Sequence, residues 1–253
     1  YYHRMQINDA NKFKNLLIPI IILIIPIFLV LIQPDLGTSI LIALSGLVVI
    51  WLSGVNIKYF IYSTLTLIIS APFVIYLLEP YQKIRILTFF NPGRDPLGAG
   101  YQIIQSKIAV GSGGLSGKGF LKGTQSYLEF LPEKHTDFIF TLLTEDFGMF
   151  GAGCLLLAYA LIIMFGLRIS MNAQSIFAKH VALGITFLLF LHVIINISMV
   201  MGLMPVVGIP LPFVSYGGTS MMTMLIAMGF LLNAHVHRDV SLTSGQGLSG
   251  SRF

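Results

Sequence analysis

Residues 16–32 read LLIPIIILIIPIFLVLI, an apolar run that contains no charged side chain. A helix of about 20 apolar residues spans the hydrocarbon of a bilayer and satisfies its own backbone hydrogen bonds there. Comparable runs follow at roughly 35–53, 57–78, 147–167, 180–202 and 214–232. The sequence therefore predicts an all-α polytopic membrane protein with six transmembrane helices.

The composition excludes an ordinary soluble domain. Of 253 residues, 55% are hydrophobic and only 10% are charged, and the mean hydropathy is +0.85. Soluble proteins average about 25% charged residues. The single cysteine, Cys154, excludes a disulfide framework or a thiolate metal site. In a membrane protein the net charge of +5 bears on orientation and anionic lipid, and we expect no nucleic-acid partner.

Basic residues alternate between the short connections. One set of connections and ends carries Arg4, Lys12, Lys14, Lys58, Arg168, Lys179 and Arg238. The turns at 33–37 and 203–212 carry no Lys or Arg. By the positive-inside rule both ends of the chain are cytoplasmic and the segment from about 79 to 137 is extracytoplasmic. That segment has seven basic residues of its own, but its length is near the limit at which loop charge governs translocation.

Several further features complete the outline. Gln33-Pro34-Asp35 separates the first two runs and predicts a tight hairpin, and Pro19, Pro26 and Pro72 predict kinks. Residues 1–239 are expected to form the membrane domain. Residues 240–253 have the Gly/Ser composition of a disordered linker. The first residues, YYHR, resemble the middle of a longer chain.

The extracytoplasmic segment is too long to be structureless. Apolar positions at 101, 104 and 108 predict a short helix, which either lies in the membrane interface or seals the loop against the bundle. The glycine-rich residues 111–119 fail both the Walker A and the dinucleotide-binding templates. They are interpreted as a flexible basic segment that approaches an anion, or as a mobile hinge.

The most distinctive stretch of this segment covers residues 131–146. On a helix, Asp137, Thr141, Thr144 and Glu145 share one polar face. Asp137 is a functional candidate, or else the N-cap of a helix beginning at Phe138. About 12 Å of helical rise separates Asp137 from Glu145, too far for the carboxylate pair of a glycoside hydrolase. A diphosphate leaving group needs no proton, so one general base plus cations is sufficient.

Polar groups elsewhere allow two interpretations each. Asp35 either caps the second helix or lines an outer cavity. His192 and Asn196 form a helix–helix hydrogen bond or a proton path. Residues 205–220, rich in Pro, Gly and Ser and including Ser215, form either a re-entrant substrate-facing segment or close helix packing.

Four motifs resemble RodA-type members of the SEDS (shape, elongation, division and sporulation) family, more closely than the division-type members. These are residues 33–39 (QPDLGTS), 95–107 (DPLGAGYQIIQSK), 131–140 (LPEKHTDFIF) and 205–218 (PVVGIPLPFVSYGG). The resemblance extends to about Asp239. It implies a ten-helix fold of which this chain supplies helices five to ten, the first four being absent.

The resemblance implies a peptidoglycan glycosyltransferase of the bacterial cytoplasmic membrane that polymerises lipid II during cell elongation and rod-shape maintenance. By match to the family's Thr-Asp-Phe motif, Asp137 is the essential aspartate, here interpreted as the general base. A class B penicillin-binding protein and other elongation-complex proteins are the implied partners. A lipid II flippase and a non-catalytic scaffold are the alternatives.

Further site residues are inferred from charge and loop position. Substrate-binding candidates are Lys107, Lys118, Lys122, Arg94, Glu145, Asp35 and Ser215. The four basic residues are the candidates for neutralising the diphosphate. A divalent cation is a candidate for sharing that role, although no ligand cluster in the sequence identifies a metal site.

Overall fold

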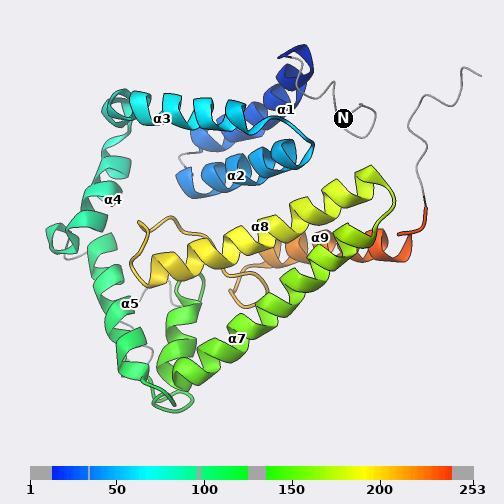
Figure 1. Cartoon of the computed structure of the whole chain (residues 1–253). Coiled ribbons are helices and arrows are strands. Elements are labelled where there is room, and N and C mark those ends of the chain that lie inside the picture. The colour runs from blue at the N-terminus through cyan, green and yellow to red at the C-terminus, as the bar shows by residue number, and fades with distance from the viewer. Residues whose placement is uncertain (1–12, 34, 96–97, 125–134, 241–253) are drawn as a thin grey trace, which may run out of the picture. The chain divides into compact units, whose positions relative to one another are not determined.

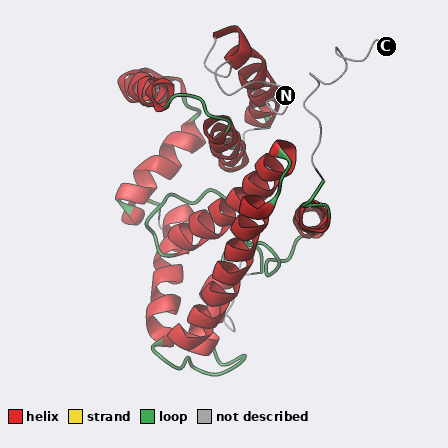
Figure 2. Cartoon of the chain, turned by 45° about the vertical axis from the view of Figure 1, so that its right-hand side comes forward, coloured by secondary structure: helices red, strands yellow, loops and turns green. Residues whose placement is uncertain are grey.

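The computed structural model describes residues 13–33, 35–95, 98–124 and 135–240. In this part of the chain every regular element is a helix, as Figures 1 and 2 show. In chain order the elements are α1 (Phe13–Ile32), α2 (Leu36–Leu52), α3 (Ile57–Leu77), α4 (Pro80–Phe90), the 3-10 helix η3 (Pro92–Arg94), α5 (Ala99–Gly113), α7 (Ile139–Asn172), α8 (Ile176–Val200) and α9 (Gly218–Val236).

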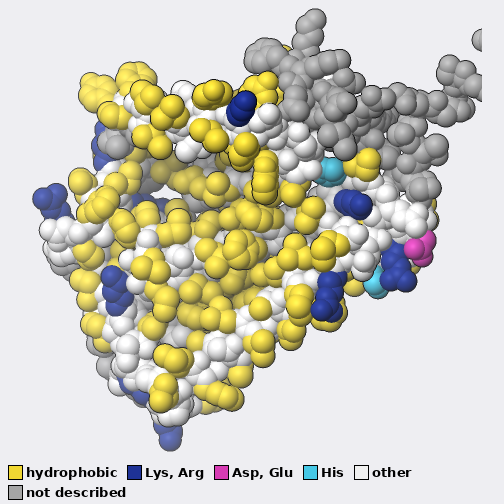
Figure 3. Space-filling model, in the orientation of Figure 1, with side chains coloured by type: hydrophobic (Ala, Val, Ile, Leu, Met, Phe, Trp, Pro, Cys, Tyr) yellow, Lys and Arg dark blue, Asp and Glu magenta, His cyan; other side chains and the backbone are white. Residues whose placement is uncertain are grey.

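The predicted all-α polytopic membrane protein is confirmed, since each of the six apolar runs coincides with a helix. Four segments are both long and apolar enough to cross a bilayer, namely Asn15–Ile32, Ile139–Asn172, Ile176–Val200 and Gly218–Val236. Two shorter apolar helical stretches are Leu36–Leu52 and Ile57–Ser70. Hydrophobic side chains cover much of the face in Figure 3, as lipid-facing helices require.

The chain divides into two compact units. One unit comprises residues 1–66, 163–189 and 225–253. Within it, α1 packs on α2 where Gly46 leaves room for the side chain of Leu23. Asp35 begins α2 as its N-cap, because its carboxylate accepts from the N–H (3.0 Å) and the hydroxyl (2.6 Å) of Thr38. The predicted hairpin between α1 and α2 and the capping interpretation of Asp35 are therefore confirmed.

The other unit comprises residues 67–162 and 190–224. Its apolar core joins α5, the start of α7, the end of α8 and the non-helical connection before α9, through Ile103, Phe138, Phe140, Ala152, Tyr159, Val193, Met199, Val200, Val206 and Leu211. The candidate site lies in this unit. Its position therefore depends on how these four segments pack against one another.

Several predicted boundaries need correction. α7 begins at Ile139, one residue later than expected, and extends well beyond the predicted 147–167. α9 begins at Gly218 and not near 214, because the Pro- and Gly-containing residues before it are not helical. Pro34, residues 131–134 and the tail after residue 240 lie outside the described residues.

Candidate active site

Three successive main-chain carbonyls hold the segment that carries Asp137. The N–H of Tyr216 donates to the carbonyl of His135 (2.8 Å), and the hydroxyl of Ser215 donates to the carbonyl of Thr136 (2.6 Å). The side-chain amide of Asn196 donates to the carbonyl of Asp137 (2.8 Å). The donors come from α8 and from the connection between α8 and α9. Residues 135–137, although non-helical, are thus fixed in position before any substrate binds.

The connection between α8 and α9 is itself fixed by buried polar groups. Asn196 also donates to the carbonyl of Ile209 (2.7 Å), and the hydroxyl of Ser215 accepts from the N–H of Leu211 (2.6 Å). The hydroxyl of Tyr159, on α7, donates to the carbonyl of Pro212. Asn196 and Ser215 therefore each bind the Asp137 segment and this connection at once, and both are buried.

The Asp137 side chain is half-buried beside this connection. A side chain at Gly208 would place its Cβ 3.3 Å from Oδ2 of Asp137, so glycine leaves the carboxylate room. A cavity of about 610 Å³ lies alongside, lined by His135, Ile139, Val214, Ser215, Tyr216, Gly217, Gly218 and Met221. Asp137 lies in sequence between two lining residues, His135 and Ile139.

The polar face predicted on α7 exists, but it points into protein. Thr141 is fully buried and shares a hydrogen bond with Ser106 of α5 (2.9 Å), whose hydroxyl donates to the carbonyl of Val200 (2.8 Å). Thr144 bonds back to its own helix. This face therefore attaches α7 to α5 and α8.

The helix predicted around 101–108 is confirmed and packs against the bundle through a different face. Ile103, Ser106 and Ala109 are buried, whereas Ile104 and Ile108 are exposed. The polar Ser106 occupies the buried face because Thr141 and Val200 satisfy its hydroxyl. The face that contacts the bundle is thus not the one marked by apolar spacing, and the exposure of Ile104 and Ile108 is compatible with the alternative that these side chains lie in the membrane interface.

Glu145 lies fully buried in an ion pair. The ammonium of Lys118 is 2.7 Å from Oε1 of Glu145. The hydroxyl of Thr124 donates to the same oxygen (3.1 Å) and accepts from the ammonium of Lys118 (2.9 Å). Asp146, also buried, accepts from the N–H groups of Leu121 (3.1 Å) and Gly123 (3.2 Å). Both carboxylates therefore hold the loop that follows α5.

α7 is broken at Gly148, and the glycine-rich segment fills the break. Gly148 has φ 66° and ψ −161°, outside the helical region. The carbonyls of residues 145 and 146 accept from the N–H groups of Lys118 and Gly119 (both 3.0 Å). The N–H groups of residues 149 and 150 donate to the carbonyls of Gly114 (2.9 Å) and Leu115 (3.1 Å). The amides of Lys118 and Gly119 are thus bonded within the chain, which argues against anion binding by these two groups. The hinge interpretation of residues 111–119 stays a prediction.

The remaining candidates lie apart or point to solvent. Lys107 is exposed, and its side chain passes over Gly202 in the turn after α8. Lys122 and Arg94 are exposed, and Asp35 belongs to the other unit. Among the described residues, no group of three or more His, Cys, Asp or Glu side chains is placed to hold a metal ion.

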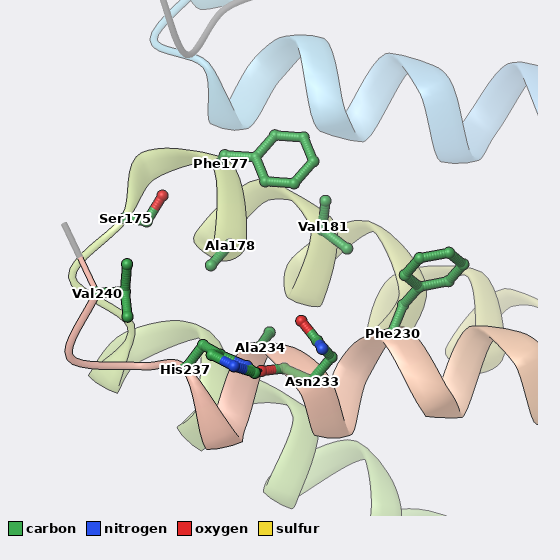
Figure 4. Close-up of a pocket in the computed structure, with 9 residues that line it drawn as sticks. All are labelled: Ser175, Phe177, Ala178, Val181, Phe230, Asn233, Ala234, His237 and Val240. Carbon is green, nitrogen blue, oxygen red and sulfur yellow. The ribbon is translucent and has the colours of Figure 1, made fainter. Parts of the chain in front are cut away.

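The other unit contains a second cavity of about 280 Å³, shown in Figure 4. The start of α8 and the end of α9 line it with aromatic and aliphatic side chains and with Ser175, Asn233 and His237. None of the site residues predicted from the sequence lines this cavity.

Sequence reasoning missed the function of Asn196 at the site. It was expected either to bond to another helix or to belong to a proton path, but its side-chain amide donates to the carbonyls of two non-helical residues. Its position within an apolar run marked it as unusual, whereas its partners lie 59 and 13 residues away. No periodicity in the sequence indicates such pairs.

Comparison with known proteins shows the family to which the chain belongs. Residues 1–240 match the model of the FtsW/RodA/SpoVE family, described as cell cycle protein. The chain is 49% identical over 228 residues to the peptidoglycan glycosyltransferase MrdB of Escherichia coli K12, covering 90% of this chain and 62% of MrdB. It is 42% identical to stage V sporulation protein E of Bacillus subtilis, covering 89% of this chain and 61% of that protein. The chain therefore spans about three fifths of the length of these relatives.

Solved structures share the fold. One, described as "Structural coordination of polymerization and crosslinking by a peptidoglycan synthase complex", matches with a TM-score of 0.75 and 30% identity, covering 90% of this chain and 63% of the other. The rod shape determining protein RodA of Thermus thermophilus matches with a TM-score of 0.60 over 92% of this chain and 61% of the other, and at 21% identity that likeness concerns the fold alone.

Proposed function

Because the chain belongs to the SEDS family, the family of FtsW, RodA and SpoVE, we propose that it is the C-terminal part of a peptidoglycan glycosyltransferase that polymerises lipid II during cell elongation. The relatives named peptidoglycan glycosyltransferase support the reaction class. The observation that carries the proposal is the fixing of residues 135–137 by three carbonyl hydrogen bonds beside a cavity. An enzyme needs its reactive group held in this way before substrate arrives.

In the proposed reaction Asp137 is the general base. Its carboxylate takes the proton from the acceptor sugar hydroxyl as that oxygen attacks the anomeric carbon of the donor. The new C–O bond forms while the bond from the anomeric carbon to the lipid diphosphate breaks, and the diphosphate leaves with the electron pair. General-base catalysis by a carboxylate within hydrogen-bond reach of the hydroxyl typically raises the rate by about 10²–10⁴-fold.

The departing diphosphate needs cationic partners. Lys118 is bound to buried Glu145, so its ammonium is already committed. Exposed Lys107 lies at the turn leading into the connection that contacts Asp137, which makes it the best-placed of the proposed cations. Lys122 and Arg94 are exposed and remain secondary candidates, whereas Glu145, Ser215 and Asp35 are better explained by the hydrogen bonds they form.

The proposed location is the bacterial cytoplasmic membrane, with both ends of this chain in the cytoplasm and residues 79–137 outside. The alternation of basic residues in the short connections supports this orientation. A class B penicillin-binding protein within the elongation complex is the proposed partner. The likeness to a chain from a structure of a peptidoglycan synthase complex supports that assignment.

The test uses the full-length protein, reconstituted with lipid II, in wild-type form and as Asp137→Asn. Asparagine keeps the shape of the side chain, so the backbone hydrogen bonds of residues 135–137 should survive. We expect glycan-strand formation to fall by about 100-fold or more, as loss of a general base predicts. Near wild-type polymerisation by the variant would refute the assignment.

The same vesicles distinguish the flippase and the scaffold. Lipid II movement between leaflets is measured in parallel with polymerisation. Loss of movement with polymerisation retained would identify a flippase. Absence of both activities from vesicles that hold the wild-type protein, with partner binding intact, would leave only a scaffold.

A further inference from the structure

The glycine-rich segment and the break in α7 together expose a group of large apolar side chains. We name residues 114–121 and 147–150 the tip. Its exposed apolar side chains, each 45–77% accessible, are Leu115, Phe120, Leu121, Phe147, Met149 and Phe150. The ring centroids of Phe120 and Phe147 lie 6.0 Å apart, so the two segments of the tip share one apolar surface. A water-exposed loop has no reason to carry such a surface.

The backbone of the tip is unusually well satisfied for a loop. The N–H groups of Lys118 and Gly119 bond into the break of α7, and those of Met149 and Phe150 bond back to the loop. The carboxylate of Asp146 accepts from two further N–H groups, those of residues 121 and 123. Non-helical backbone enters the polar–apolar boundary of a membrane only when its polar groups are paired within the protein. The N–H groups of residues 117–119, 121, 149 and 150 meet that condition.

The tip is continuous with a membrane-spanning helix. Ile139–Asn172 is long and apolar enough to span a bilayer. The part after Gly148 rises about 36 Å, enough by itself to cross about 30 Å of hydrocarbon. Met149 and Phe150 therefore begin the spanning part, and the loop residues of the tip pack directly beside them.

The charges at the tip suit a lipid surface. Both acidic side chains there, Glu145 and Asp146, are buried, whereas Lys122 at the edge is exposed. In Figure 3 the lower end, where α5 and the first part of α7 meet in Figure 1, shows hydrophobic atoms beside Lys or Arg and no Asp or Glu. An apolar surface rimmed by exposed cations matches acyl chains below a layer of phosphates.

We propose that the tip is inserted into the lipid leaflet from which residue 149 starts its crossing. Its apolar side chains lie among the upper acyl carbons, and the ammonium of Lys122 lies at the level of the lipid phosphates. The tip is thus a second attachment to the bilayer, independent of the reaction proposed above. It fixes the depth at which the end of α5 and the first part of α7 lie relative to the membrane surface.

The test is depth measurement by spin labelling of the full-length protein in vesicles of phosphatidylethanolamine and phosphatidylglycerol. In a background without other cysteines, nitroxides are attached at Phe120→Cys and, as the matched control, at Lys122→Cys. Native Cys154, exposed on the spanning part of α7, is the lipid-facing reference. Collision rates with oxygen, which concentrates in lipid, and with a water-soluble nickel chelate are compared.

We expect the label at 120 to resemble the label at 154, with oxygen collisions exceeding nickel collisions several-fold, and the label at 122 to show the reverse. A label at 120 that collides mainly with nickel would overturn the proposal. So would a label at 120 that is shielded from both reagents only after a class B penicillin-binding protein is added, because the tip would then be a protein-docking surface.

Discussion

At the residue scale, the functional assignment depends on side chains that bind main-chain groups. Asn196 illustrates this, since its amide donates to the carbonyls of Asp137 and Ile209 from a fully buried position. Its chemistry is that of a positioning residue, because it reaches the proposed base only through the backbone.

Asn196→Leu keeps the size of the side chain but removes both donors. Leaving buried carbonyls unsatisfied costs about 1–3 kcal/mol, and a displacement of about 1 Å in a reactive group can cost about 100-fold in rate. We expect a large fall in the turnover number with a small change in lipid II affinity. The control is Thr223→Val, on an exposed face of α9, which should alter neither. An equal loss of affinity and turnover would contradict a positioning role.

Lys118 shows where the sequence misleads at this scale. Its charge and loop position made it a candidate for the diphosphate, but its ammonium is bound to Glu145, 27 residues later. Local pattern does not reveal such a pair, because burial of the carboxylate is a property of the folded chain.

Two variants distinguish whether Lys118 neutralises Glu145 or contacts the diphosphate of the substrate. Lys118→Met alone removes the ammonium that neutralises a buried carboxylate, which should cost about 3 kcal/mol and lower the midpoint of thermal unfolding. Adding Glu145→Leu removes that charge and should restore most of the stability. We expect the double variant to regain polymerisation activity together with its stability. Restored stability without restored activity would make Lys118 a substrate contact after all.

At the scale of elements, the sequence predicts helices well and their interruptions poorly. The apolar runs located α1, α2, α3, α7, α8 and α9, because membrane-spanning helices must be apolar along about 20 residues. The same apolar character gave no sign of the break at Gly148, where backbone groups of the helix bond to the loop of residues 114–119 and not to one another. The Pro- and Gly-rich composition of 205–218 did indicate a non-helical connection, but not its bonds to residues 135–137.

Two glycines of α7 give a matched test of the break. Gly148 has a conformation nearly restricted to glycine, and a Cβ there would overlap the N–H of Gly117. Gly148→Ala should therefore destabilise by about 1–3 kcal/mol or more. Gly153→Ala lies in the same helix with open space around the Cβ, and should be neutral or stabilising by up to about 1 kcal/mol. Thermal unfolding in detergent checks both, and equal shifts would argue against a structural need for the break.

At the scale of the whole molecule, sidedness follows from charge distribution. The basic residues of the short connections support the proposed orientation, with the chain ends in the cytoplasm and the α5 region outside. We expect Gly111→Cys to react with a membrane-impermeant maleimide added outside intact cells, and Asp239→Cys to react only after permeabilisation. Gly111 faces open space and Asp239 is highly exposed, so access depends on sidedness alone. The opposite labelling pattern would invert the proposed orientation.

We propose that the carboxylate of Asp137 takes part in the reaction of a substrate that other residues bind. Single-turnover joining of prebound lipid II by full-length Asp137→Asn, with binding measured in the same samples, tests it most directly. We expect lipid II affinity within about twofold of wild type and a joining rate lower by about 100-fold or more. Weakened binding with an unchanged joining rate for bound substrate would contradict it.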